Sequence, residues 1–72
     1  MTENIEHKRY VTRKAGVELV TRETGLPLTL SAVEKAAHFG DGPPVAAKYG
    51  KQLLYDPNAF VSWALARVRQ AA

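Results

Sequence analysis

A run of five residues, Gly-Asp-Gly-Pro-Pro at positions 40–44, divides this chain of 72 residues into two parts. Gly40 lacks a Cβ and can take the left-handed backbone conformation that ends a helix. Pro43 and Pro44 favour an extended backbone and cannot continue a helix. The run therefore predicts a helix that ends at Gly40, then a stiff extended crossing, then new elements.

The first of two helices predicted before this run lies between Thr12 and Gly25. The hydroxyl of Thr12 can cap the free amides of the first turn, and Gly25 can end the helix. Val17 and Val20 recur at helical spacing and give the helix an inward side. Residues 10–11, just before the cap, are expected to form a short extended segment.

The second helix is expected to begin at Thr29 or Ser31, both good capping residues, and to end at Gly40. Only about four residues separate it from the first helix, which is the spacing of a helix-turn-helix. Its buried side is predicted to consist of small or branched apolar residues, namely Val33, Ala36 and Ala37.

After the proline crossing, residues 45–49 and 52–55 are predicted strands on either side of a turn that begins at Gly50. Glycine at the first turn position suits a type II′ hairpin. A two-residue turn pairs Tyr49 with Gln52, whereas a longer loop shifts the register. The sequence leaves both registers open.

A third helix has the clearest beginning, because Asp56 can cap it and Pro57 suits its first position. Two apolar faces together cover more surface than a core of this size requires. The second face either closes the core or contacts another protein, and both interpretations stay open. The first face consists of Phe60, Trp63 and Ala64, and the second of Val61, Leu65 and Val68.

Composition narrows the class of protein. Ten lysines and arginines against seven acidic residues give a net charge of +3, which modestly favours a polyanionic partner. The absence of cysteine excludes disulfides and cysteine-based metal sites and fits a reducing cytosol. No apolar run reaches the ~18 residues of a membrane span, so no membrane role is expected. Residues 1–9 are polar and are expected to form a flexible arm before a single domain at 10–72.

Catalytic chemistry finds little support. His7 and His38 have no neighbouring ligand at metal-binding spacing, and Ser31 and Ser62 lack the surroundings of a nucleophile. The glycines of the 40–44 run do not form a phosphate loop, because two prolines follow where backbone amides are needed. We expect no enzyme activity, no catalytic residues, no cofactor and no metal site.

The outward side of the second helix is the first candidate for contacts with DNA. Thr29 and Ser31 can donate to phosphates, and Lys35 can reach a guanine edge or a phosphate. Glu34 can accept from a cytosine amino group or repel the DNA backbone. An ordinary charged surface helix explains these residues equally well. The residues on this side are Thr29, Leu30, Ser31, Glu34, Lys35 and His38.

The hairpin turn is the second candidate. Gly50 allows close approach to a DNA backbone, and Lys48 and Lys51 on either side can straddle a phosphate ridge or enter a minor groove. A solvated turn with ordinary lysines is the alternative. Tyr49, near the turn, stays open as a contact residue. The other aromatic residues considered for base stacking are expected to pack inside the protein, namely Tyr55 and Trp63.

Taken in order, these motifs resemble a family of small winged helix-turn-helix proteins, the AlpA-like regulators and excisionases. The chain looks closest to the RdfS type of recombination directionality factor, found in integrative and conjugative elements. The resemblance covers about residues 10–68, and its Gly-Asp-Gly-Pro-Pro block is the most specific part. It is carried by Tyr-Val-Thr-Arg at 10–13, Gly-Leu-Pro-Leu-Thr at 25–29, the 40–44 run, Gly50, Leu54, Tyr55 and Trp63.

The resemblance implies an α+β winged helix-turn-helix fold of the MerR and excisionase kind, with three helices and a two-stranded hairpin wing. The second helix would be the recognition helix, with Ala32 added to its contact residues, and Gly50 and Lys51 would form the wing tip. Thr12 and Arg13 would contact the DNA backbone.

The family also implies a role. Its members bind double-stranded DNA near recombination sites, often as several copies, and promote excision of a mobile element by a tyrosine-recombinase integrase. They act in the bacterial cytoplasm on the nucleoid. A transcriptional activator or repressor of the AlpA type is the alternative, and a protein-interaction module without a DNA role is a third class.

The chain departs from the family pattern at Ala32, Glu34 and Gln52, where threonine, aromatic or basic, and arginine residues are frequent. We therefore expect weak binding to a single DNA site. Linked copies on adjacent sites gain effective concentration without stronger individual contacts. This leads to the hypothesis that a neighbouring copy or the integrase contacts the second face of the third helix, formed by Val61, Leu65 and Val68.

Overall fold

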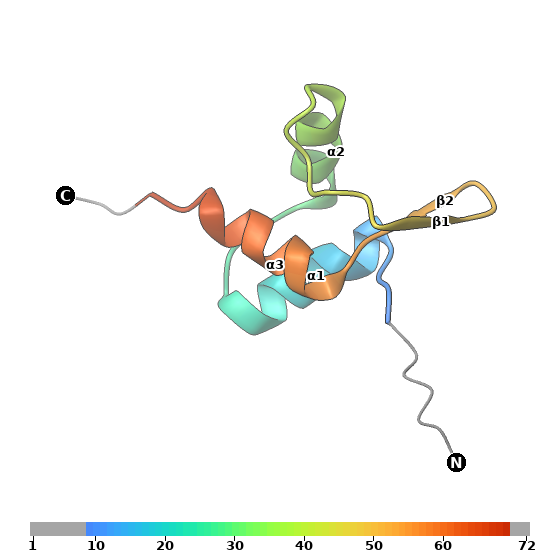
Figure 1. Ribbon diagram of the computed structural model, residues 1–72. Helices are drawn as coiled ribbons and strands as arrows, with labels where there is room; N and C mark the ends of the chain where they lie inside the picture. Colours follow the sequence, from blue (N-terminus) through green and yellow to red (C-terminus); the bar gives the residue numbers. More distant parts are fainter. Residues whose placement is uncertain (1–8, 70–72) are drawn as a thin grey trace, which may run out of the picture.

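A computed structural model describes residues 9–69, so most of the predicted arm at 1–9 and the last residues, 70–72, lie outside the described part. The described part is a small α+β domain with three helices and a two-stranded antiparallel hairpin (Figure 1). No helix in residues 9–69 is long and apolar enough to cross a membrane. The elements are α1 (Arg13–Thr24), α2 (Leu30–His38), β1 (Ala47–Tyr49), β2 (Gln52–Leu54) and α3 (Pro57–Ala66).

The predicted boundaries of α1 are confirmed. The hydroxyl of Thr12 accepts a hydrogen bond from the amide of Ala15 at 3.1 Å and caps the first turn. Gly25 follows the last turn with φ at 76°, and its amide donates to the carbonyl of Thr21. Both ends are thus set by side chains or backbone conformations that are local in the sequence.

The helix α2 begins after Thr29, whose hydroxyl accepts from the amide of Ala32 at 3.1 Å. This selects Thr29 over Ser31 as the cap. The last helical residue is His38, and Gly40 follows with φ at 82°. The glycine therefore lies two positions beyond the helix, where it turns the chain towards the proline crossing.

The helix α3 begins as predicted. A carboxylate oxygen of Asp56 accepts from the amides of Asn58 and Ala59 at 2.8 and 3.3 Å, and Pro57 occupies the first turn. Proline is favoured there because its missing amide has no partner within the helix.

The hairpin has the two-residue turn, because Tyr49 pairs with Gln52 and Lys48 with Leu53. Gly50 has φ at 63°, and no other residue type in the described chain has positive φ, so the turn has the type II′ pattern. The strands are shorter than predicted. Tyr55, expected at the end of the second strand, pairs instead with Val11 through two backbone hydrogen bonds of 2.9 and 2.8 Å.

The core lies mainly between α1 and α3, which are packed together, while α2 stands out from this pair and packs on α1 (Figure 1). Gly16 is buried on α1 because the ring of Phe60 lies directly against it. A Cβ at position 16 would stand 2.6 Å from a ring carbon of Phe60. The fully packed apolar cluster consists of Val20, Val33, Tyr55, Phe60 and Ala64.

The two predicted faces of α3 have different outcomes. Phe60 and Ala64 are buried, as expected, and Val61 of the second face also packs against the core. Leu65 and Val68 remain 48% and 47% exposed. The second face is therefore divided, with its first residue in the core and its other two residues at the surface.

Trp63 joins α3 to the chain that follows α2. It is only partly buried, and its indole N–H donates to the carbonyl of Asp41 at 2.7 Å. The guanidinium of Arg67 lies 5.0 Å from the centre of the indole ring. The Gly-Asp-Gly-Pro-Pro run is thus fixed to α3 through a side chain that lies 22 residues further along the chain.

Candidate nucleic-acid interface

An open groove of about 480 Å³ lies where the start of α1, one side of α2 and the end of the hairpin meet. We call it the basic groove, because three cationic side chains and a single carboxylate line it. Its lining unites three segments that are far apart in the sequence. The lining residues are Thr12, Arg13, Lys14, Leu30, Glu34, Lys51, Gln52 and Leu53.

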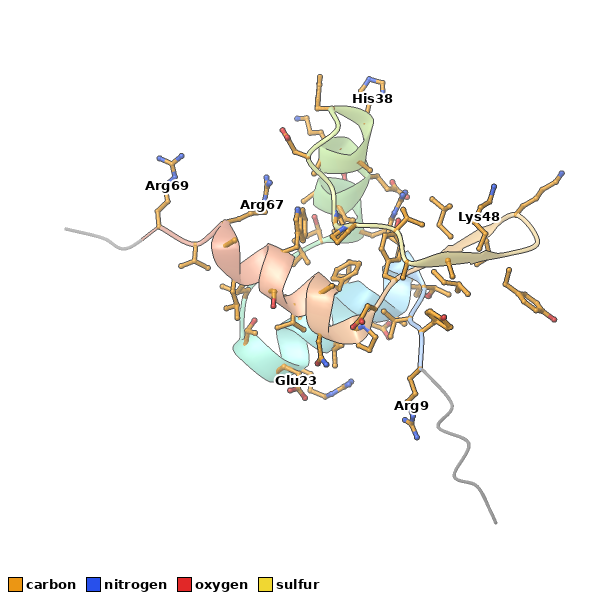
Figure 2. The ribbon with its side chains drawn as sticks, viewed as in Figure 1. Arg9, Glu23, His38, Lys48, Arg67 and Arg69 are labelled. Carbon is orange, nitrogen blue, oxygen red and sulfur yellow. The ribbon has the colours of Figure 1, made fainter. Side chains whose placement is uncertain are left out.

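The structure brings together some of the predicted contact residues of α2 and separates others. Leu30 and Glu34 line the basic groove, whereas Ala32 and Lys35 line a second hollow on another side of the helix. His38 lies at the end of α2 that is remote from the α1–α3 pair (Figure 2). Every residue predicted on the outward side is exposed, in contrast to Val33 and Ala36 on the inward side.

The register of the hairpin assigns its side chains to two faces. Residues directly paired in antiparallel strands share a face, so Lys48 and Leu53 lie on one face. Leu53 lines the basic groove, and Lys48 points to the side of the hairpin on which α2 lies (Figure 2). Tyr49, next along the strand, lies on the opposite face and is 81% exposed.

This arrangement explains the combination of a lysine with two apolar residues on one hairpin face. Tyr55 is buried at the base of the hairpin, and Leu53, in the middle of β2, packs against the core. Lys48 lies directly opposite Leu53 on β1 and is exposed. The face is therefore apolar at Leu53 and Tyr55 and basic at Lys48, and Lys51 in the turn adds a second cation to the basic groove.

The two residues predicted to contact the DNA backbone from α1 already have partners in the protein. The Thr12 hydroxyl caps α1, as described above. The Arg13 guanidinium donates to the hydroxyl of Tyr55 from Nε at 3.2 Å and from Nη2 at 2.9 Å. Arginine has five N–H donors, so three remain for other acceptors.

Lys14 is a groove residue that the sequence did not single out as a contact. It is exposed in the first turn of α1 and lines the basic groove beside Arg13. Its sequence signal was the Arg13-Lys14 pair at a helix start. A helix N-terminus carries a partial positive charge. The two basic side chains and the dipole of α1 therefore all favour an anion at the start of this helix.

A separate apolar groove of about 300 Å³ lies between the α1–α2 connection and the end of α3. Of the predicted protein-interface residues, Val68 lines this groove and Leu65 is exposed nearby on α3, while Val61 packs on the core. The exposed apolar surface of α3 thus lies towards its C-terminal end. The groove is lined by Leu26, Pro27, Leu28, Ala64, Arg67 and Val68.

Comparison of the chain with protein-family models, with curated protein sequences and with solved structures finds no match. Within residues 9–69, no group of three or more His, Asp or Glu side chains could hold a metal ion. The basic groove, with α2 on one side and the hairpin on the other, is the candidate nucleic-acid interface.

Proposed function

We propose that this chain is a winged helix-turn-helix protein that binds double-stranded DNA, with α2 as the recognition helix and the hairpin as the wing. The basic groove supports this proposal most directly. In it, cations from α1 and from the hairpin flank the exposed side of a short helix. A polyanion that enters the groove meets Lys14 from one element and Lys51 from another.

The shape of the domain suits a duplex. The helix α2 stands out from the α1–α3 pair, and the hairpin extends on one side of it (Figure 1). A major groove about 12 Å wide admits a single helix. With α2 in that groove, Lys48 and Lys51 are placed to contact the phosphates at its edge.

The contacts divide into two kinds. Lys14 and Lys51 are assigned to phosphates because they line the basic groove and are exposed. Lys48 is assigned to a phosphate because it is exposed opposite the groove residue Leu53. Glu34 is assigned to a base edge, since a carboxylate beside phosphates would be repelled whereas cytosine offers an amino group. Lys35 lies on a neighbouring side of α2 and extends the contact surface.

The biological role follows from the resemblance of the sequence to excisionases. We propose an architectural factor that binds as several copies and promotes integrase-mediated excision of a mobile element. Leu65 and Val68 supply an exposed apolar surface for a neighbouring copy or the integrase. A transcriptional regulator of the AlpA type would use the same DNA contacts at a promoter.

Two experiments test this proposal in order. Selection from a random duplex pool tests for DNA binding and yields a preferred site. An excision assay then compares recombination by a tyrosine-recombinase integrase at its attachment sites, with and without the protein. Binding without stimulation of excision would favour the transcriptional role, and no retention of any duplex at low salt would contradict DNA binding altogether.

A further inference from the structure

We propose that Arg13 is a positioning residue for the hairpin rather than a contact to phosphate. This inference concerns how the proposed DNA-binding surface is held, and it therefore rests on the proposed function. The starting observation is that Nε and Nη2 of Arg13 both donate to the hydroxyl of Tyr55, 42 residues away in the chain.

Tyr55 is the residue at which the hairpin joins the rest of the protein. It directly follows β2, and its side chain is only 1% exposed. Its ring packs edge-on against Phe60, with 5.3 Å between the ring centres. Its backbone pairs with Val11 in both directions, at 2.9 and 2.8 Å. The direction in which the hairpin leaves the domain therefore depends on how Tyr55 is held.

The side chain of Arg13 adds a third attachment between the start of α1 and Tyr55, besides the two backbone hydrogen bonds of Val11. The Nε and Nη2 groups form one of the two edges through which arginine binds a carboxylate or phosphate with two hydrogen bonds. In this structure that edge is directed to the Tyr55 hydroxyl, and Arg13 itself is partly buried. Val11 and Arg13 flank the Thr12 cap, so the start of α1 holds the hairpin base at two points.

The consequence reaches the lysines of the hairpin. Lys48 lies on the same face as Leu53, and Leu53 lines the basic groove next to Arg13. A hairpin that pivots at Tyr55 would move Lys48 and Lys51 away from α2. Arg13 thus acts on DNA affinity through the orientation of these two side chains.

The test combines two readouts on the full chain. The variants are Tyr55→Phe, which keeps the ring and the charge and removes only the hydroxyl, and Arg13→Met. Arg13→Lys, which retains the charge, is the matched control. Backbone order parameters for residues 47–54 are measured without DNA, and affinity for a short duplex is measured in the parent and in the Lys48→Ala, Lys51→Ala background.

The proposal predicts lower order parameters across the hairpin in Tyr55→Phe and Arg13→Met. It also predicts that each variant lowers DNA affinity about fivefold in the parent and much less without the two lysines, because contacts in one network are not additive. Arg13→Lys should lose affinity as well, since a single ammonium cannot replace the two-donor edge.

Two results would overturn the proposal. One is an unchanged hairpin in both variants, whether or not the protein binds DNA. The other is an Arg13→Met loss that has the same size in both backgrounds while Tyr55→Phe has no effect, which would identify a direct phosphate contact. If the parent chain does not bind DNA but the hairpin loosens, positioning stands and the proposed function fails.

Discussion

The ring of Phe60 on α3 lies directly on Gly16 of α1, so that a Cβ at position 16 would stand 2.6 Å from a ring carbon. A Cβ cannot stand this close to the ring, so either the Phe60 side chain or one of the two helices would have to shift. Phe60 is fully buried and also packs edge-on against Tyr55 and Trp63, at 5.3 and 5.9 Å between ring centres. The contact thus sets the distance between the two helices that hold the core.

Gly16→Ala tests this contact, because the contact decides whether the substitution raises or lowers the free energy of unfolding. In an exposed helix position the substitution stabilises by about 1 kcal/mol, because alanine has the higher helix propensity. Here we expect a loss of about 1–3 kcal/mol in the free energy of unfolding, from overpacking against Phe60. Urea unfolding measures it, and Glu18→Ala on the exposed side of α1 is the control. A stabilised Gly16→Ala variant would show that the helices are not in close contact there.

The sequence predicted interactions between residues that are close in the chain, but not those between residues that are distant in it. The Thr12 and Asp56 caps and the Gly50 turn were predicted, because each depends on residues within a few positions. The pairing of Val11 with Tyr55 was not predicted, since it joins residues 44 positions apart. Hydrophobic spacing shows which side of a helix is buried but not which distant residue covers it.

The candidate site follows the same rule. Exposure of the outward side of α2 was predicted from helical periodicity. The basic groove and the inclusion of Lys14 in it depend on the angle between α1, α2 and the hairpin, which no local pattern specifies. Likewise, Arg13 was predicted to contact the DNA backbone, and its hydrogen bonds to Tyr55, 42 residues away, follow from no local pattern.

Trp63→Phe tests the link between α3 and the segment after α2. The substitution keeps an aromatic ring but removes the N–H that donates to the Asp41 carbonyl at 2.7 Å. We expect a loss of about 1 kcal/mol in the free energy of unfolding, the usual worth of one such bond. Faster amide exchange at Asp41, which donates to Ala36, should accompany it. Unchanged stability and exchange would show that the bond contributes nothing in solution.

Glu34 should determine sequence preference rather than overall affinity. Placed at a base edge, it favours cytosine, and its replacement by alanine should remove about 1–3 kcal/mol of discrimination at one base pair. The measurement is the affinity of parent and variant for the selected site and for its single-base substitutions. Ser62→Ala, at an exposed position on α3, is a neutral control. A uniform gain in affinity across all sites would instead place Glu34 beside phosphates.

The surface at the end of α3 should matter for assembly and not for folding. Leu65 and Val68 are about half exposed, so Leu65→Glu with Val68→Glu should leave the melting temperature almost unchanged. The same variant should bind two adjacent sites without cooperativity, because the apolar contact between copies is lost. Val61→Glu, in contrast, should unfold the domain, since Val61 packs on the core. Retained cooperativity in the double variant would remove this surface from the account.

The central claim, that the basic side of the hairpin binds DNA, is tested most directly by two variants with equal charge changes. Lys48→Ala with Lys51→Ala removes two cations beside α2, and Arg22→Ala with Arg69→Ala removes two exposed cations elsewhere. Affinity for a duplex is measured as a function of salt, where each phosphate contact contributes about 0.9 to the slope of log affinity against log salt. We predict that the lysine variant loses about two contacts and that the arginine variant keeps the parental slope. Equal slopes in the two variants, or no binding by the parent chain at low salt, would contradict the account.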